Sequence, residues 1–398
     1  MSHAKFSPSS AHRWLRCTGS IEKCKDAPST SSWYADEGTA AHELGAWCLE
    51  SGNDAEHYLG KEIHVRDEEG EIRNSFIVDD DMAGYVQVYV DSVRDAAEGA
   101  DLLMVEQRVD FSDYIGVEGQ TGTADALILK SAEQLLDVHD LKYGQGEKVF
   151  AKENEQEMLY ALGGLYEFCL LYEINTVRLN IHQPRLDHMD SWEISVSALE
   201  NFAKMAKKKA HEGLLPDAPL TPGETQCRWC PAKATCEAAA EAVHNAVADD
   251  FGNLDLPDAT TEPSTLEDNY KMVGFVRDWA NAVEKEMLDR LHSEPGTIQG
   301  FKLAHGKAGN RVWQDEDRVV DLFKRFRLRK EEMFTMKPLS PAQAEKRFKK
   351  QPKRWSKLEE LITRGKPSIK IVPADDPRPG ITTDEDFSDL TGGSENGE

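Results

Sequence analysis

Two acidic residues and a lysine stand on neighbouring segments near the middle of the chain. Asp125 lies in the run Gly122–Leu129, and Asp140 and Lys142 lie in the run Leu135–Lys142. Alternate residues of a strand share a face, so Asp140 and Lys142 should point the same way. A turn at 131–133 can bring Asp125 beside them. Paired carboxylates can hold a divalent cation, which activates water and offsets charge on a phosphate oxygen. With a lysine to stabilise developing charge, the set predicts phosphodiester hydrolysis.

An Asp-x-Lys alone is more typical of an exposed hairpin with weak surface ion pairs, so its neighbours matter. His42 follows Gly38-Thr39-Ala40-Ala41 on an early predicted helix. Gln156 and Tyr160 are four apart, which places them on one helical face just after the hairpin. Glu106, on the strand before the hairpin, is a further candidate carboxylate, with a structural role as the alternative.

The ordered set resembles the RecB-type branch of the PD-(D/E)xK nuclease superfamily over about residues 37–165. That branch has a Gly-Thr-x-x-His helix, a Gly-x-x-Asp strand, a (D/E)-x-Lys strand and a Gln-x-x-x-Tyr helix in this order. The resemblance implies Mg²⁺ or Mn²⁺, and an imidazole ligand suits Mn²⁺ somewhat better than oxygen ligands alone. It implies that Lys142 is catalytic and that Gln156 and Tyr160 brace the site. The implied metal ligands are His42, Asp125, Asp140 and the main-chain carbonyl of Leu141. The acid before Leu141-Lys142 is Asp140, where many members have Glu.

A second group of residues suited to metal binding is the run Cys227–Cys236, which reads C-x2-C-x5-C. Three thiolates in so short a span predict a metal site that needs a fourth thiolate. The candidates are Cys17, Cys24, Cys48 and Cys169. The apolar neighbours of Cys48 and Cys169 predict buried free cysteines instead.

The cysteine layout resembles that of nucleases that bind a [4Fe–4S] cluster, namely the AddB nuclease domain and the CRISPR-associated RecB-like exonucleases. In these, one cysteine precedes the histidine helix and three follow the nuclease core. The resemblance implies Cys17, Cys227, Cys230 and Cys236 as ligands, with Cys24 as the alternative to Cys17. Spacing alone leaves zinc open as the alternative metal. Either metal would close a loop of roughly 210 residues and restrict the unfolded chain.

The elements that must position these residues predict an α/β fold. Helical patterns cover much of 1–60, the stretch 81–99, Glu153–Tyr172 and Ser197–Glu212. Strand patterns cover Leu102–Phe111, Thr123–Leu129, Gln134–Lys142 and Thr176–Gln183. This order predicts a mixed central sheet flanked by helices, and the resemblance implies a restriction-endonuclease-like core. We expect a core with the cysteines at 1–248, a linker at 249–265, a helical and basic region at 266–372, and a disordered acidic tail at 373–398.

Charge and composition restrict the class of protein. The 398 residues carry a net charge of −25, yet residues 301–372 hold 20 Lys and Arg against 9 Asp and Glu. An acidic body with one basic segment suits a protein that touches a polyanion at a defined place, and a solvated basic face is the alternative. There is no apolar run of about 18 residues and no secretory signal at the N-terminus. We therefore expect no membrane span, and a reducing, cytoplasmic location in a bacterial host.

Over its full length the sequence resembles a family of bacteriophage and prophage proteins assigned to the same nuclease superfamily. The resemblance includes Gly309–Trp313, Leu339–Lys346 and Ile371–Pro379. It implies a metal-dependent DNA exonuclease for recombination or repair, acting with a single-strand binding or annealing protein. A catalytically weak DNA-binding or assembly protein that keeps the fold is the alternative. A zinc-stabilised scaffold with an incidental Asp-x-Lys is a third reading. Cleavage polarity, strand preference, exonuclease or endonuclease action and oligomeric state stay open at this point.

Overall fold

A computed structural model of the chain describes residues 4–27, 32–67, 69–251 and 263–293, with single positions at 298, 301, 325, 355 and 356. Contacts divide the chain into two units, residues 1–304 and 305–398. The helices and strands named below all belong to the first unit. Apart from those single positions, the predicted basic region after 301 and the predicted acidic tail lie outside the described residues.

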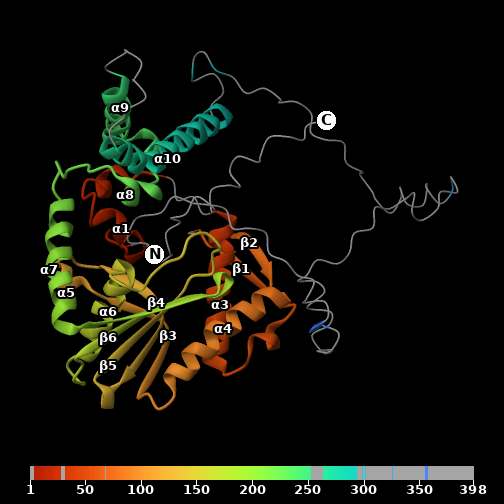
Figure 1. Ribbon diagram of the computed structural model, residues 1–398. Helices are drawn as coiled ribbons and strands as arrows, with labels where there is room; N and C mark the ends of the chain where they lie inside the picture. Colours follow the sequence, from red (N-terminus) through yellow and green to blue (C-terminus); the bar gives the residue numbers. More distant parts are fainter. Residues whose placement is uncertain are drawn as a thin grey trace. The chain divides into compact units, whose positions relative to one another are not determined.

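The first unit is built around a five-stranded sheet with spatial order β3-β4-β5-β6-β7 (Figure 1). β3, β4 and β5 form an antiparallel meander, β6 runs parallel to β5, and β7 returns antiparallel to β6. Parallel neighbours need a crossover, and α6 (Glu155–Phe168) supplies it between β5 and β6. The strands are β3 (Leu102–Asp110), β4 (Thr121–Lys130), β5 (Leu135–Leu141), β6 (Thr176–Gln183) and β7 (His188–Ser195). The predicted α/β fold with a mixed sheet is confirmed.

The edge strand β7 adds to the strands that the sequence predicts. Its side chains alternate between more and less exposed positions, and most of them are polar. An edge strand with a solvated face has few apolar residues to mark it, so its pattern is weak. The inner strand β5 is buried at every position, which is typical of a strand covered on both faces.

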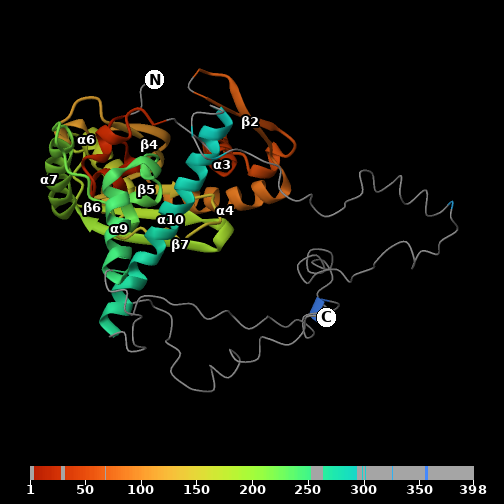
Figure 2. The same ribbon diagram turned by 90° about the horizontal axis from the view of Figure 1, so that it is seen from above.

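Helices cover both faces of the sheet (Figure 2). One face packs on α6, α7 (Val196–Gly213) and the short helices α1 (Ala11–Trp14) and α5 (Ser112–Ile115), with Trp14, Phe111 and Leu136 in its core. The other face packs on α3 (Trp33–Ser51) and α4 (Asp80–Ala97), and α3 also contacts the hairpin formed by β1 (Glu62–Arg66) and β2 (Ile72–Ile77). The candidate site residues therefore come from elements on both sides of the sheet.

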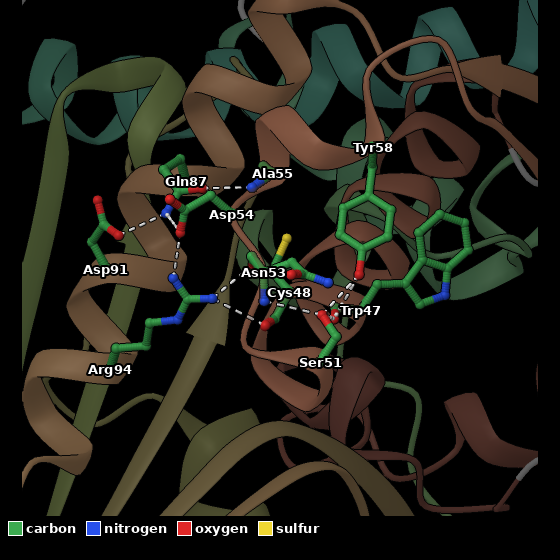
Figure 3. A network of polar contacts seen from close by, with 10 residues as sticks. All are labelled: Trp47, Cys48, Ser51, Asn53, Asp54, Ala55, Tyr58, Gln87, Asp91 and Arg94. Carbon is green, nitrogen blue, oxygen red and sulfur yellow. Dashed lines mark hydrogen bonds and ion pairs between the residues drawn. The ribbon is translucent and has the colours of Figure 1, made fainter.

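A polar network fastens the C-terminal end of α3 to α4 (Figure 3). α3 ends at Gly52, whose φ of 74° is the left-handed conformation that glycine adopts readily. The Arg94 guanidinium on α4 donates to the main-chain oxygens of Cys48 (3.1 Å) and Asn53 (2.7 Å), and it pairs with Asp54 (2.6 Å). Carbonyls at a helix C-terminus lack partners within the helix, so these bonds hold α3 in place.

The remaining helices gather around the cysteine-bearing segments. They are α2 (Ser20–Lys23), α8 (Glu224–Arg228), α9 (Glu237–Phe251) and α10 (Pro263–Ser293). α10 contacts α8, α9 and the turn Lys233–Thr235, with Phe275 buried among them. α9 extends past residue 248 and α10 begins at Pro263, so most of the predicted linker lies at 252–262, outside the described residues. Within the described part of the chain, no helix has the length and apolar character needed to cross a bilayer.

Candidate active site and cysteine cluster

The hairpin of β4 and β5 brings the two predicted aspartates together. Ala126 pairs with His139 in the antiparallel register, so Asp125 lies opposite Asp140. Both side chains are buried. The main-chain N–H of Leu141 donates to Asp125 Oδ2 at 2.7 Å, which fixes this carboxylate against the end of β5. Opposed residues of an antiparallel pair are close neighbours, so the two carboxylates lie near one another and the Asp125 charge acts on Asp140.

Lys142 joins Asp140 to the helix α6. Its Nζ lies 2.6 Å from Asp140 Oδ2 and donates to Gln156 Oε1 at 3.0 Å. The Gln156 amide in turn donates to the Tyr160 hydroxyl at 2.9 Å. α6 begins at a definite point because the Asn154 side chain accepts from the N–H groups of the first turn. A continuous chain of contacts therefore leads from Asp140 through Lys142 and Gln156 to Tyr160.

Charge is balanced within this buried group. Burial disfavours the ammonium form, but Asp140 overcomes this and raises the pKa of Lys142. Burial also raises the pKa of Asp140, which Lys142 opposes and nearby Asp125 reinforces. Burial and the Asp140 charge raise the pKa of Tyr160, so its hydroxyl stays protonated. Lys142 is therefore held as a cation beside one carboxylate and aimed by a neutral amide.

His42 reaches the site from the opposite side of the sheet, in the middle of α3. Its Nδ1 lies 3.0 Å from Asp125 Oδ1, and its side chain is 30% exposed. Burial disfavours the charged ring, but Asp125 outweighs it and raises the pKa of His42 to about 9. Burial likewise opposes ionisation of Asp125, while His42 and the N–H of Leu141 hold its pKa below the usual value. The predicted histidine and aspartate are thus in contact.

Glu106, the additional candidate, stands with them. It lies opposite Asp125 on β3, between the pairs Val105–Ala126 and Gln107–Ala124, and its φ is 48°. Partial desolvation and then the Asp125 charge raise the pKa of Glu106 to about 7. Among the described residues, the metal-type group of three whose ligand atoms lie within 4.8 Å of one another is His42, Glu106 and Asp125. Asp140, predicted as a ligand, lies outside that group and is paired with Lys142.

The strand β6 holds the end of β5 from its other edge. The main-chain N–H of Lys142 donates to the carbonyl of His182 at 2.8 Å. The His182 ring stacks on His139 beside Asp140, with Nε2 and Nδ1 2.9 Å apart. Burial and the neighbouring His139 lower the pKa of His182 to about 3, so the His182 ring is neutral. Sequence reasoning missed this pair, although a histidine in each of two apolar strands was its signal.

Glu157 is a second residue that the sequence analysis did not single out. It follows Gln156 on α6 and is fully buried. Burial and the neighbouring Asp140 charge raise its pKa well above the usual carboxyl range. The signal was an acidic residue on the apolar face of an amphipathic helix. A neutral Glu157 carboxyl would leave Lys142 and Asp140 to balance one another.

The glycine of the Gly-x-x-Asp strand has a steric role. A Cβ at Gly122 would stand 2.8 Å from Tyr160 Cε1 and 2.7 Å from Pro8 Cγ. Both distances are shorter than carbon atoms tolerate. The glycine therefore lets the Tyr160 ring and the N-terminal segment close over the strand that carries Asp125.

The four predicted cluster ligands line one small cavity. It has a volume of about 20 Å³, and its wall includes Cys17, Cys227, Cys230 and Cys236. The main-chain N–H of Thr221 donates to Cys17 Sγ at 3.3 Å, and that of Gly223 donates to Cys227 Sγ at 3.4 Å. Hydrogen bonds of this kind stabilise thiolate ligands. The donor set and the room between the thiols therefore fit a thiolate-bound metal group.

The other three cysteines differ in their surroundings. Cys24 lies beside the cluster, with its Sγ 3.6 Å from Cys230 Sγ. Cys48 is buried, as expected, and burial raises the pKa of its thiol to about 11. The prediction for Cys169 is wrong, because this residue is exposed. α6 ends at Phe168, so the apolar residues that follow, Leu170 and Leu171, face solvent with Cys169 instead of the core.

Comparison with known proteins identifies a family, and it finds a solved structure among the matches. The solved structure, titled "Crystal structure of SSO0001", is 17% identical over 38% of this chain and 67% of that chain, with a TM-score of 0.23. A likeness this low carries no argument. The model of a family described as "Protein of unknown function (DUF2800)" matches residues 3–379. Because this match spans most of the sequence, the chain belongs to the DUF2800 family.

Proposed function

We propose that this protein is a metal-dependent deoxyribonuclease, and that it acts as an exonuclease in phage or prophage DNA recombination or repair. One observation supports this most: residues from four separate segments meet in a single connected site. His42 contacts Asp125, and Asp125 accepts a hydrogen bond from the main-chain N–H of Leu141. Lys142 pairs with Asp140 and donates to Gln156. The resemblance to RecB-type nucleases supports DNA as the substrate and exonuclease action.

The donor set of the site fits a hard divalent cation. One imidazole and carboxylates suit Mg²⁺ or Mn²⁺, with the imidazole favouring Mn²⁺. His42, Asp125 and Glu106 would hold the ion, because their ligand atoms lie within 4.8 Å of one another. The ion, when bound, activates a water and offsets charge on a phosphate oxygen. Asp140 and the carbonyl of Leu141 would complete the ligand set from the adjacent strand.

The protein's own residues would orient the reacting groups. The Lys142 ammonium, held by Asp140 and Gln156, would donate to a phosphate oxygen as charge develops there. Tyr160 keeps its proton and fixes the Gln156 amide, so the direction of the Lys142 side chain is set before substrate binds. Such preorganised donors do not need to rearrange during the reaction, which is what makes them effective.

The test is cleavage of end-labelled linear DNA and circular DNA with Mg²⁺ or Mn²⁺. We expect linear DNA to be degraded, EDTA to abolish cleavage, and Asp125→Ala, Asp140→Ala and Lys142→Ala to lose most activity. Lys130→Ala and Glu133→Ala, at the opposite end of the same hairpin, are matched controls that should cleave normally. Wild-type rates from Lys142→Ala would show that the assigned site is wrong. Tight DNA binding without any cleavage would favour a DNA-binding or assembly protein.

For the cysteine cavity we propose a [4Fe–4S] cluster bound by Cys17, Cys227, Cys230 and Cys236, with zinc as the alternative. Four sulfurs around one zinc ion would lie about 3.8 Å apart, given a Zn–S bond of about 2.3 Å. Among the described residues, no three cysteine sulfurs lie within 4.8 Å of one another. The four thiols are thus further apart than the ligands of one zinc ion, although the cavity of about 20 Å³ between them would have to widen to hold the larger group.

Metal content tests the cysteine proposal separately from nuclease activity. Anaerobically purified protein should be brown, with broad visible absorption that fades on oxidation. Cys17→Ser should lose iron and stability, whereas Cys48→Ala should keep its iron, because Cys48 is a core residue away from the cavity. One equivalent of zinc without iron would overturn the cluster assignment.

We propose that the basic segment 301–372 contacts the DNA backbone. The chain outside residues 301–372 is strongly acidic, so phosphate contacts from the basic residues of 301–372 would offset repulsion of the DNA backbone. These residues lie almost entirely outside the described part of the chain. A single-strand binding or annealing protein is the expected partner, as the full-length resemblance implies. Removing 301–398 should weaken DNA binding and its salt dependence but leave bound iron unchanged.

A further inference from the structure

A fifth cysteine stands beside the cavity that the four predicted ligands line. Cys24 closes the short helix α2, and it is absent from the cavity wall formed by the other four. Its Sγ nevertheless lies 3.6 Å from the Sγ of Cys230, which is 206 residues away in the sequence. Two thiols from distant segments are thus in direct contact next to the cluster site.

Accessibility divides the five neighbouring cysteines into two groups. Cys24, Cys230 and Cys236 are partly exposed, whereas Cys17 and Cys227 are buried. Among the three partly exposed cysteines, Cys24 and Cys230 are the pair whose sulfurs are in contact. The buried pair accept main-chain N–H groups, from Thr221 and Gly223. A soluble thiol or disulfide can therefore reach Cys24 or Cys230 more readily than the buried cysteines, since exchange depends on access as well as on reactivity.

We infer that Cys24 and Cys230 form a redox-active pair, which closes into a disulfide when Cys230 is not held by a metal. The inference rests on the proposed metal site in one respect only, because a bound metal would compete for Cys230. It does not rest on nuclease activity. The 3.6 Å contact between the two partly exposed thiols supports it directly.

Oxidised glutathione is a sufficient co-reactant for the step. The thiolate of Cys24 attacks one glutathione sulfur, which breaks the glutathione disulfide, forms a mixed disulfide and releases one reduced glutathione. The thiolate of Cys230 then attacks the Cys24 sulfur and releases the second glutathione. Two protein thiols are oxidised, one glutathione disulfide is reduced to two thiols, and the two protons pass to the departing glutathione thiolates.

The bond would keep the same two parts of the chain together as the cluster does. It would join α2 to the segment between α8 and the turn Lys233–Thr235. A cross-link between residues this far apart restricts the unfolded chain strongly. Oxidation that strips the cluster would then leave the N-terminal segment fastened to the cysteine-rich segment. Reduction would return both thiols and make Cys230 available for metal again.

Tryptic mapping of the full-length protein tests the inference directly. The protein is stripped of metal with a chelator, equilibrated with oxidised and reduced glutathione, alkylated, and digested without reductant. Arg16, Lys23, Arg228 and Lys233 separate the five cysteines into five different tryptic peptides. We expect the peptide of Cys24 linked to that of Cys230 to dominate, and to be several-fold less abundant in protein that keeps its metal.

Cysteine variants distinguish the Cys24–Cys230 pair from the other possible pairings. Cys24→Ser should leave Cys230 free or glutathionylated and should keep wild-type metal content, and Cys169→Ser is the exposed-cysteine control that should map like wild type. A disulfide of Cys230 chiefly with Cys227 or Cys236 would overturn the inference. So would loss of metal in Cys24→Ser equal to that in Cys17→Ser, because Cys24 would then be a ligand. A mapped Cys24–Cys230 bond in protein that cleaves no DNA would contradict the proposed nuclease function and leave this inference standing.

Discussion

The ion pair between Asp140 and Lys142 allows stability and catalysis to be separated. The Asp140 side chain is 2% exposed and that of Lys142 is 25% exposed. Removing one partner of a buried pair leaves the other as an uncompensated charge, at a cost of roughly 3–5 kcal/mol. For Lys142→Met we expect the free energy of unfolding to fall by about 3 kcal/mol, the lower end of this range, because water reaches part of the lysine. For Asp140→Asn we expect about 2 kcal/mol, because Gln156 still accepts from the ammonium.

The double variant should be far more stable than the sum of the single changes. With both charges gone no buried ion is left unpaired, so we expect a total loss of about 2 kcal/mol and a coupling of about 3 kcal/mol. Urea unfolding of wild type, both single variants and the double variant measures this coupling. Lys130→Met, on the same hairpin, is the control for loss of a lysine away from the site.

Cleavage assays on the same proteins complete the test. The double variant should be about as stable as Asp140→Asn but should have no nuclease activity, because the proposed chemistry needs the ammonium itself. Additive unfolding free energies, with coupling below about 0.5 kcal/mol, would refute the reasoning that the pair is buried and mutually dependent. Cleavage by the double variant at a rate near that of wild type would instead show that Lys142 acts only by supporting the fold.

Three further predictions address pH, packing and the cation. His182 is neutral in the folded protein and gains a proton on unfolding when the pH is below about 6.5. The free energy of unfolding should therefore decrease below pH 6.5, by up to about 1.4 kcal/mol per pH unit. His182→Gln should flatten this slope when urea unfolding is measured at several pH values. Gly122→Ala should push Tyr160 away and lower the cleavage rate at least severalfold. Gly84→Ala, in open space on α4, is the control and should cleave at the wild-type rate. Equal rates for the two variants would show that Gly122 is not needed for the close approach of Tyr160. Glu106→Gln should raise the Mn²⁺ concentration for half-maximal cleavage severalfold, and an unchanged value would exclude Glu106 as a ligand.

Much of the site was predictable from local pattern. Alternation along a strand places Asp140 and Lys142 on one face, and a short turn places Asp125 across from them. Helical spacing places Gln156 and Tyr160 together in the same way. These relations depend on neighbours in sequence or on one hairpin, so the residue types and their order were sufficient to predict them.

Relations between distant segments needed the tertiary structure. The packing of α3 on the sheet decides which carboxylates lie near His42. In the structure these are Glu106 and Asp125, whereas Asp140 pairs with Lys142. The burial of Cys169 also failed as a prediction, because the end of α6 is set by tertiary packing and not by apolar neighbours.

For the cysteines, too, part of the site follows from the local sequence and part only from the tertiary structure. The spacing of Cys227, Cys230 and Cys236 by itself predicted a metal site, because three thiols in one short loop must lie near one another. Only the fold placed Cys17 in the wall of their cavity and Cys24 against Cys230. Those two cysteines are close together in sequence and equally suited as ligands. The way the N-terminal helices pack against the segment around α8 gives the two cysteines different positions, and spacing in the sequence alone does not show such a long-range contact.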